Sequence, residues 1–260
     1  MPKIEKHAPG SFCWVEVGTT DRDGAKTFYA ALFGWIAVDI PTGPNEPYTI
    51  FKLKDRDAAG AYTMQPEERA MTPPHWNLYV AVDDADATTW RAAKLGGKII
   101  APPYDVMTFG TMAVIQDPTG AIFCIWQPRD HQRTAVKGEN GTVCWADLST
   151  PDPGRAKQFY EGLFGWKIGA APQFPPEYLV IENDGGFIGG IPSAVYRKPD
   201  TPPYWMPFFL AGDVDGLAAK AKELGGAEYM APTSMGGARL AVLADPQGAA
   251  FSIIQPPSRG

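Results

Sequence analysis

Histidine and cysteine are scarce in this chain of 260 residues, which contains three of each. A metal centre built from these side chains therefore has few donors available. The cysteines form no C-x-x-C pair, and their odd number is typical of a reduced protein rather than of a disulfide framework. The opening residues, MPKIEKHAPG, lack the apolar segment of a signal peptide. We therefore expect a cytoplasmic protein.

The sequence also lacks runs of basic residues and long apolar runs. Its net charge is −6 and its pI about 5.1, so we expect neither nucleic acid nor an anionic membrane as a partner. No apolar stretch approaches the roughly 20 residues that a membrane span requires. With 45% hydrophobic and 20% charged residues, the composition is that of a globular protein with one large or two ordinary domains.

The chain repeats itself once over almost its whole length. Three pairs of matching stretches lie 128–131 positions apart, namely CWVEVGTTD and CWADLSTPD, AKTFYAALFGW and AKQFYEGLFGW, and DPTGAIFCIWQP and DPQGAAFSIIQP. We therefore expect a first domain at residues 10–128 and a second at residues 141–257. The segment between them, residues 129–140, is polar and without periodicity, which indicates a linker.

Each half is itself doubled. The spacing of Asp, Leu and Gly is the same at four places, which begin at Asp21, Asp84, Asp152 and Asp213. This pattern predicts a helix capped by Asp and closed by a glycine in a left-handed turn, at Gly34, Gly97, Gly165 and Gly226. Strand-like runs precede each Asp and follow each Gly. The sequence therefore predicts an α+β fold of four βαβββ modules, with mixed sheets curved into cups, helices outside and a cavity inside.

The paired modules, the FYaaLFGW motif and the DPxGaxFxIxQ endings resemble the vicinal-oxygen-chelate (VOC) superfamily. That superfamily includes glyoxalase I, extradiol dioxygenases, fosfomycin-resistance enzymes and bleomycin-binding proteins. Within it, the chain is most similar to the mycobacterial 27 kDa antigen type, often labelled as hydroxylases. The resemblance implies that both halves are glyoxalase-like domains, but function depends on the site and not on the fold.

The resemblance also implies where metal ligands would lie. Counting from the capping Asp and from the Asp of DPxG gives six positions, namely Trp14, Asn77, Trp145, Met206, Cys124 and Ser252. None is a histidine or a carboxylate, and an indole nitrogen is a donor only. We therefore expect no metal cofactor. A divalent metal remains the alternative, held poorly by Asn77 and Cys124 with nearby Glu16.

Strand alternation predicts which side chains line the cups. Lining residues should be Trp14, Glu16, His75, Asn77, Tyr79, Cys124 and Trp126 in the first cup and Trp145, Asp147, Tyr204, Met206, Phe208 and Ser252 in the second. Cys13 and Cys144 should face the helices instead. Each cup would then be aromatic with one acid, which suits a flat apolar ligand with a polar group.

Several of these residues allow two interpretations. Glu16 and Asp147 could act as general base or proton shuttle, or could be structural anchors bonded to neighbours. Trp14 and Trp145 could be stacking platforms or could fill the cups. We expect Trp14 and Glu16 to contact ligand together, and any polar chemistry to belong to the first cup. Cys124 is expected to be a small apolar residue rather than a nucleophile.

These observations favour a metal-independent protein that binds a small aromatic or polyketide-like molecule, for sequestration or for acid–base transformation. An alternative is a metal-dependent enzyme of the superfamily, either a glyoxalase-type lyase or isomerase or a dioxygenase-type oxidoreductase. A third is an interaction protein whose cups are filled. We expect a monomer or a homodimer. The sequence leaves open whether each cup forms within one half or across the two halves.

Overall fold

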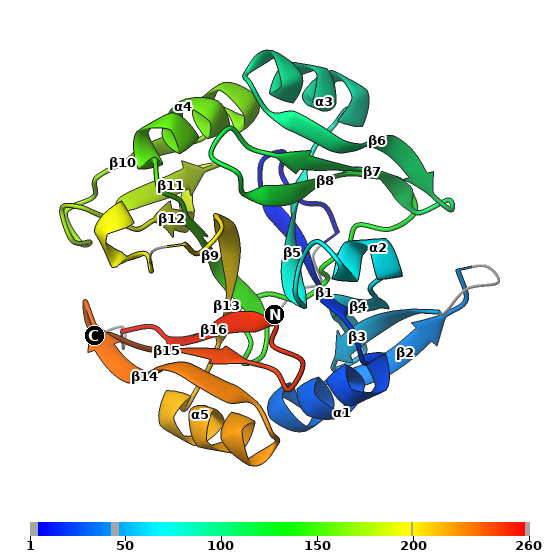
Figure 1. Cartoon of the computed structure of the whole chain (residues 1–260), viewed down its shortest axis with the longest axis vertical. Coiled ribbons are helices and arrows are strands. Elements are labelled where there is room, and N and C mark those ends of the chain that lie inside the picture. The colour runs from blue at the N-terminus through cyan, green and yellow to red at the C-terminus, as the bar shows by residue number, and fades with distance from the viewer. Residues whose placement is uncertain (1–4, 43–46, 199, 258–260) are drawn as a thin grey trace.

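The computed structural model describes residues 5–42, 47–198 and 200–257, which form two eight-stranded mixed sheets (Figure 1). The first half consists of β1 (Phe12–Thr19), α1 (Arg22–Phe33), β2 (Ile36–Ile40), β3 (Tyr48–Leu53), β4 (Arg56–Thr63), α2 (Pro66–Arg69), β5 (His75–Ala81), α3 (Ala85–Lys94), β6 (Lys98–Val106), β7 (Gly110–Gln116) and β8 (Ile122–Pro128). The second consists of β9 (Val143–Ser149), α4 (Pro153–Phe164), β10 (Lys167–Gly169), β11 (Leu179–Asn183), β12 (Gly186–Ile191), the 3-10 turn η1 (Ala194–Tyr196), β13 (Tyr204–Leu210), α5 (Val214–Glu223), β14 (Ala227–Met235), β15 (Ala238–Ala244) and β16 (Ala250–Gln255).

The predicted βαβββ module is confirmed four times, and α2 and η1 connect the two modules of each half. The strand orders are β2-β3-β4-β1-β5-β8-β7-β6 and β10-β11-β12-β9-β13-β16-β15-β14. In each sheet the two modules join through an antiparallel pair, β1 with β5 and β9 with β13. Each cup is therefore built within one half, which answers the question that the sequence left open.

The helices begin and end for local reasons. All four capping aspartates accept a hydrogen bond from a backbone N–H in the first turn, as predicted. Gly34 and Gly165 close α1 and α4 with φ of 71°. In α3 and α5 the left-handed glycines are Gly96 and Gly225, one position before those expected. These helices have 10 residues instead of 12, and a leucine, Leu95 or Leu224, stands between the last helical residue and the glycine. Among the described residues, no helix is long and apolar enough to cross a membrane.

A bulge near the start of β1 and of β9 corrects one expectation about facing. The register shifts between Phe12 and Trp14, and the equivalent shift in the second sheet falls between Phe208 and Phe209. The extra residue breaks strict alternation. Cys13 therefore packs with Trp14 in the cluster that fills the first cup and not against the helices.

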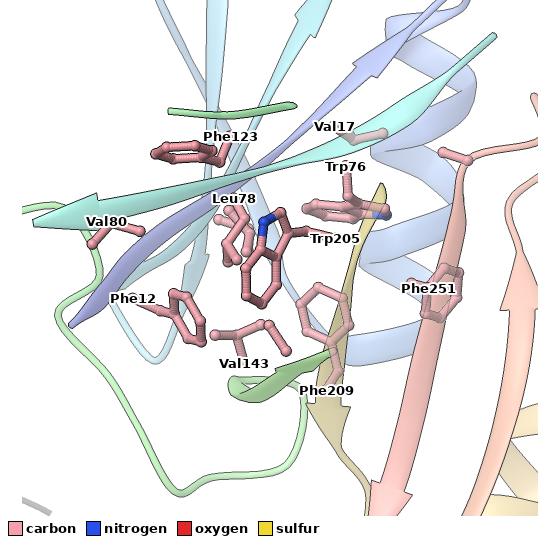
Figure 2. Packing of buried hydrophobic residues seen from close by; sticks show 14 of the residues in the cluster. Phe12, Val17, Trp76, Leu78, Val80, Phe123, Val143, Trp205, Phe209 and Phe251 are labelled. Atoms are coloured by element: carbon pink, nitrogen blue, oxygen red, sulfur yellow. The ribbon is translucent and has the colours of Figure 1, made fainter. Parts of the chain in front are cut away.

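The two halves share one hydrophobic core between them. Helix α1 contacts α5, α3 contacts α4, and β5 contacts β13, so the helix-bearing faces of the two sheets lie against each other. Figure 2 shows Trp76 and Leu78 of the first half beside Trp205 and Phe209 of the second. The repeated Phe-Tyr and Gly-Trp motifs belong to this core, as expected.

Two tryptophans from the repeated motif fasten the halves to each other. The indole N–H of Trp35 donates to the carbonyl of Gly141 at 3.0 Å, and that of Trp166 donates to Gly10 at 2.8 Å. Each bond joins the end of one helix to the segment that precedes the first strand of the other half. The tryptophan of the repeated motif thus forms an equivalent hydrogen bond from each half to the other.

Candidate functional site

The first cup contains a carboxylate whose two oxygens both accept hydrogen bonds from tyrosines. Tyr48 donates to Oε2 of Glu16 at 2.7 Å, and Tyr79 donates to Oε1 at 2.5 Å. The indole of Trp14 donates to the Tyr48 hydroxyl at 2.9 Å. Burial and the neighbouring Glu16 charge raise the pKa of both tyrosines well above the usual value, so both stay protonated donors.

Side chains fill the first cup. Trp14 exposes 1% of its surface and Trp126 none, and both pack with Tyr79 and Cys124 in one apolar cluster. Arg133, from the segment expected to be only a linker, lies over the ring of Trp126, with Cζ 3.6 Å from the ring centroid. Five of the predicted first-cup residues are thus brought together in a packed interior, namely Trp14, Glu16, Tyr79, Cys124 and Trp126.

His75 and Asn77, which were also predicted to line the first cup, are not part of the buried cluster that fills it. His75 is partly exposed, and its Nδ1 lies 2.9 Å from the carbonyl of Pro73. Asn77 donates to the hydroxyl of Tyr62 at 3.1 Å, and Tyr62 in turn donates to Glu68 at 2.5 Å. These polar side chains are therefore partnered with each other and with the backbone.

The second cup repeats the arrangement of Trp, Tyr and acid found in the first. Tyr178 donates to Oδ1 of Asp147 at 2.5 Å, and Trp145 donates both to that oxygen at 2.8 Å and to the Tyr178 hydroxyl at 2.9 Å. Phe208 takes the place of Tyr79, because it pairs with Trp145 in the same register in which Tyr79 pairs with Trp14. Among the described residues, no phenol therefore donates to the other carboxylate oxygen.

An open cavity of about 180 Å³ lies beside this carboxylate. Five of the predicted residues line it, namely Asp147, Tyr204, Met206, Phe208 and Ser252. Sequence reasoning missed the rest of the lining, which comprises Ser149 and Val242 on the strands and Pro192, Ser193, Tyr196 and Arg197 after β12. The cavity is thus a largely apolar space with a carboxylate, hydroxyls and a guanidinium at its walls.

Two polar groups at the cavity, the Ser252 hydroxyl and one carboxylate oxygen of Asp147, have no described hydrogen-bond partner. The hydroxyl of Ser252 is fully buried and has no hydrogen-bond partner among the described residues, and a buried hydroxyl without a partner is costly. Both described hydrogen bonds to Asp147 fall on Oδ1. Burial raises the pKa of Asp147 to about 6, although the bonds from Tyr178 and Trp145 act in the opposite direction. This acid therefore changes its charge close to neutral pH.

Tyr48 and Tyr178 are the most important residues that sequence reasoning missed. They begin the runs YTIFKL and YLVIEN and lie 130 positions apart, within the offset of the repeat, so a full alignment of the two halves would have paired them. Each hydroxyl lies directly over a glycine of the next strand, Gly60 or Gly190, where a Cβ would overlap it.

The side chains of the cups do not suit a transition metal. Within the described ranges, no three His, Cys, Asp or Glu side chains come together. Around the second cavity the donor set has one carboxylate, with Met206 and Ser252 at two of the positions where superfamily ligands are expected. Catalytic metal sites hold the ion with about three convergent protein ligands. The residues present do not fit such an ion.

The fold and site define a tandem protein of paired βαβββ modules with one filled and one open cup. Residues 11–125 match the Glyoxalase/Bleomycin resistance protein/Dioxygenase superfamily, and residues 143–254 match a glyoxalase-like domain. The chain belongs to this superfamily, which confirms the resemblance and the fold predicted from the sequence.

Two relatives match over nearly the whole chain. A Mycobacterium bovis protein with the provisional name glyoxylase CFP32 is 36% identical over 263 residues, covering 98% of each chain. The anthracycline biosynthesis protein DnrV of Streptomyces peucetius is 32% identical over 277 residues, covering 97% of this chain and 95% of its own.

Solved structures show the same fold at low identity. The Mn(II)-bound glyoxalase of Novosphingobium aromaticivorans has a TM-score of 0.66 at 16% identity, covering 95% of this chain and 82% of its own. An extradiol ring-cleaving dioxygenase of B. fuscum has a TM-score of 0.66 at 15% identity, covering 99% of this chain and 75% of its own. At such identities the likeness concerns the fold alone.

Proposed function

We propose that the second cup binds a small hydroxylated aromatic molecule, without a metal ion, and that Asp147 accepts the hydrogen bond of its hydroxyl group. The observation that carries this proposal is the difference between the two cups. Glu16 has a phenol on each oxygen, whereas Asp147 has one phenol and, beside it, an open cavity.

The second cup lacks one phenolic hydrogen-bond donor that the first cup has. Tyr79 presents a phenolic hydroxyl to Glu16, and its counterpart Phe208 presents none. A ligand that carries a phenolic hydroxyl would supply to Asp147 what Tyr79 supplies in the first cup. Hydrogen bonds to a charged acceptor are about twice as strong as neutral ones. Ser252 offers a second buried hydroxyl for a polar edge of the same ligand.

The cavity volume restricts the size of this ligand. A cavity of about 150 Å³ in another protein holds one benzene molecule, and the second cup offers about 180 Å³. A single ring with one or two substituents fits within it. A fused polyketide would enter with one ring and leave the others outside. A relative named for anthracycline biosynthesis supports a small organic ligand.

Asp147 also supports acid–base chemistry in addition to binding. Its pKa of about 6 leaves it mostly ionised at neutral pH while it can still exchange a proton there. Its contacts with Tyr178 and Trp145 hold the carboxylate in one orientation. Sequestration needs only the hydrogen bond, and transformation additionally needs the proton to move to or from the ligand hydroxyl.

Titration with phenol and with benzene tests the proposal. Phenol should bind the natural protein, and Asp147→Asn should weaken that binding roughly tenfold, because a hydrogen bond to a charged group contributes about 1.5–3 kcal/mol. Benzene should bind more weakly and should not respond to this variant. Phe208→Tyr should abolish phenol binding by supplying the hydroxyl from the protein, with Phe187→Tyr, which is exposed, as its control. Equal binding of phenol and benzene in both proteins would refute the proposal.

A further inference from the structure

The segment between the two halves places one cationic side chain inside the first cup. Arg133 exposes 7% of its surface, and three aromatic rings surround its guanidinium. Its Cζ lies 3.6 Å from the ring centroid of Trp126, 5.4 Å from that of Tyr79 and 5.5 Å from that of Trp14. The shortest of these distances is that of a flat guanidinium stacked on an indole.

Aromatic faces, and not an ion pair, hold this cation. No acidic side chain of the described ranges forms a salt bridge with Arg133, and its Nε is buried without a hydrogen-bond partner. The negative charge of Glu16 acts through Tyr79, whose hydroxyl donates to that carboxylate at 2.5 Å. Such a bond makes the tyrosine ring a better partner for a cation.

The position of Arg133 has a conformational cost. Its φ is 71°, in the left-handed region that side chains other than glycine rarely adopt. The flanking backbone is fixed to the cup, because Thr134 N–H donates to Cys13 at 2.9 Å and the carbonyl of His131 accepts from Trp126 at 3.0 Å. The cup therefore stabilises a strained conformation that a polar linker would not adopt by itself.

We propose that the first cup is a recognition site for a planar cation of the guanidinium class, and that the chain occupies this site with its own Arg133. The second cup lacks the same specificity. At the position of Trp126 it has Ile254, which offers no aromatic face, and at the position of Tyr79 it has Phe208, which carries no hydroxyl. This inference is independent of the ligand proposed for the second cup.

Chemical rescue of Arg133→Ala tests the site. Removing the caged guanidinium should lower the melting temperature by roughly 4–8 °C, since desolvated cation–π contacts are lost. Ethylguanidinium at about 20 mM, a probe concentration far below that of denaturants, should restore roughly half of this loss. Ethylammonium at the same ionic strength should restore little. The natural protein and Arg129→Ala, which removes a partly exposed guanidinium paired with Asp105, should not distinguish the two cations.

A second variant, Arg133→Lys, tests the proposed site if Arg133→Ala does not fold. Arg133→Lys keeps the charge and most of the volume but loses the flat stacking surface. It should increase the amide hydrogen exchange rate at Thr134 roughly tenfold, because the segment is held less tightly. Equal exchange in Arg133→Lys and the natural protein would overturn the proposal. So would an Arg133→Ala protein that responds equally to both cations.

Discussion

The hydroxyl of Tyr29, on α1 of the first half, donates a 2.9 Å hydrogen bond to the carboxylate of Asp245 in the second half. The reverse pair, Tyr160 with Asp117, has the same length. Each aspartate is the first residue of a DPxG turn, and its other oxygen accepts backbone N–H groups of that turn. One repeated acid thus shapes a turn and joins the halves.

Tyr29→Phe should lower the free energy of unfolding by about 1–3 kcal/mol, because it leaves a buried carboxylate oxygen without a donor. Urea denaturation measures this change. Tyr160→Phe should cost a similar amount, and the two losses should add, since the pairs share no partner. The control is Tyr229→Phe, whose ring is 55% exposed. Losses no larger than that of the control would contradict the assigned role.

Asp147→Asn should raise stability at pH 7. The pKa of Asp147 is about 6 in the folded protein and about 4 in an unfolded chain. Between these values the folded state holds a proton that the unfolded state has released, so the stability of the natural protein falls as the pH rises from about 4 to about 6. Asp147→Asn cannot bind this proton, so its stability does not fall over this pH range.

Melting temperatures from pH 4 to 8 measure the effect of Asp147. The variant's advantage should be full above pH 6 and should shrink towards pH 4. Asp184→Asn, at an exposed turn, should show no such trend. A constant difference across the range would argue against a raised pKa at this site.

Gly190→Ala should disrupt the second cup. A Cβ at this position would overlap the Tyr178 hydroxyl, and the displaced ring would lose its bonds to Asp147 and Trp145. Phenol affinity should therefore fall together with stability. Gly60→Ala should affect Tyr48 in the same way but should leave phenol affinity unchanged. Gly169→Ala is the control, because no atom lies within 4 Å of the added methyl group.

The purified chain should carry no stoichiometric transition metal. The expectation depends on the residue types at the six superfamily ligand positions, of which none is a histidine or a carboxylate. Elemental analysis after extensive dialysis measures the metal content. About one zinc, nickel or iron ion per chain, lost in Asn77→Ala, would show that the first cup binds metal after all.

The sequence predicted the modules well because repeats and caps are local signals. Each capping aspartate acts within a few residues of its own position, and strand alternation follows from backbone geometry. Alternation failed at Cys13 because a bulge depends on how two strands pair. The role of Arg133 was not predictable, since nothing in a polar segment without periodicity indicates which side chain enters a cavity.

Which cup is open could not be predicted either. Trp126 and Arg133 fill the first cup, whereas the second has Ile254 at the position of Trp126. Tyr79 and Phe208 have the same position and nearly the same volume, but only the tyrosine donates to a carboxylate. The sequence-based preference for the first cup as the polar site followed from its larger number of polar residues. In the folded chain those residues bond to neighbouring side chains and to the backbone. That Trp14 and Glu16 contact ligand together stays a prediction, which Trp14→Phe and Glu16→Gln can test by phenol titration.

The core between the halves limits how such a protein can diverge. Phe33 and Trp35 of the first half lie 5.0 and 5.7 Å from Phe209 of the second, centroid to centroid, so a change on one side requires a matching change on the other. The cups face no such requirement. Evolution is therefore free to alter one cup at a time. A hybrid that combines halves from two relatives would have mismatched side chains in the core between the halves.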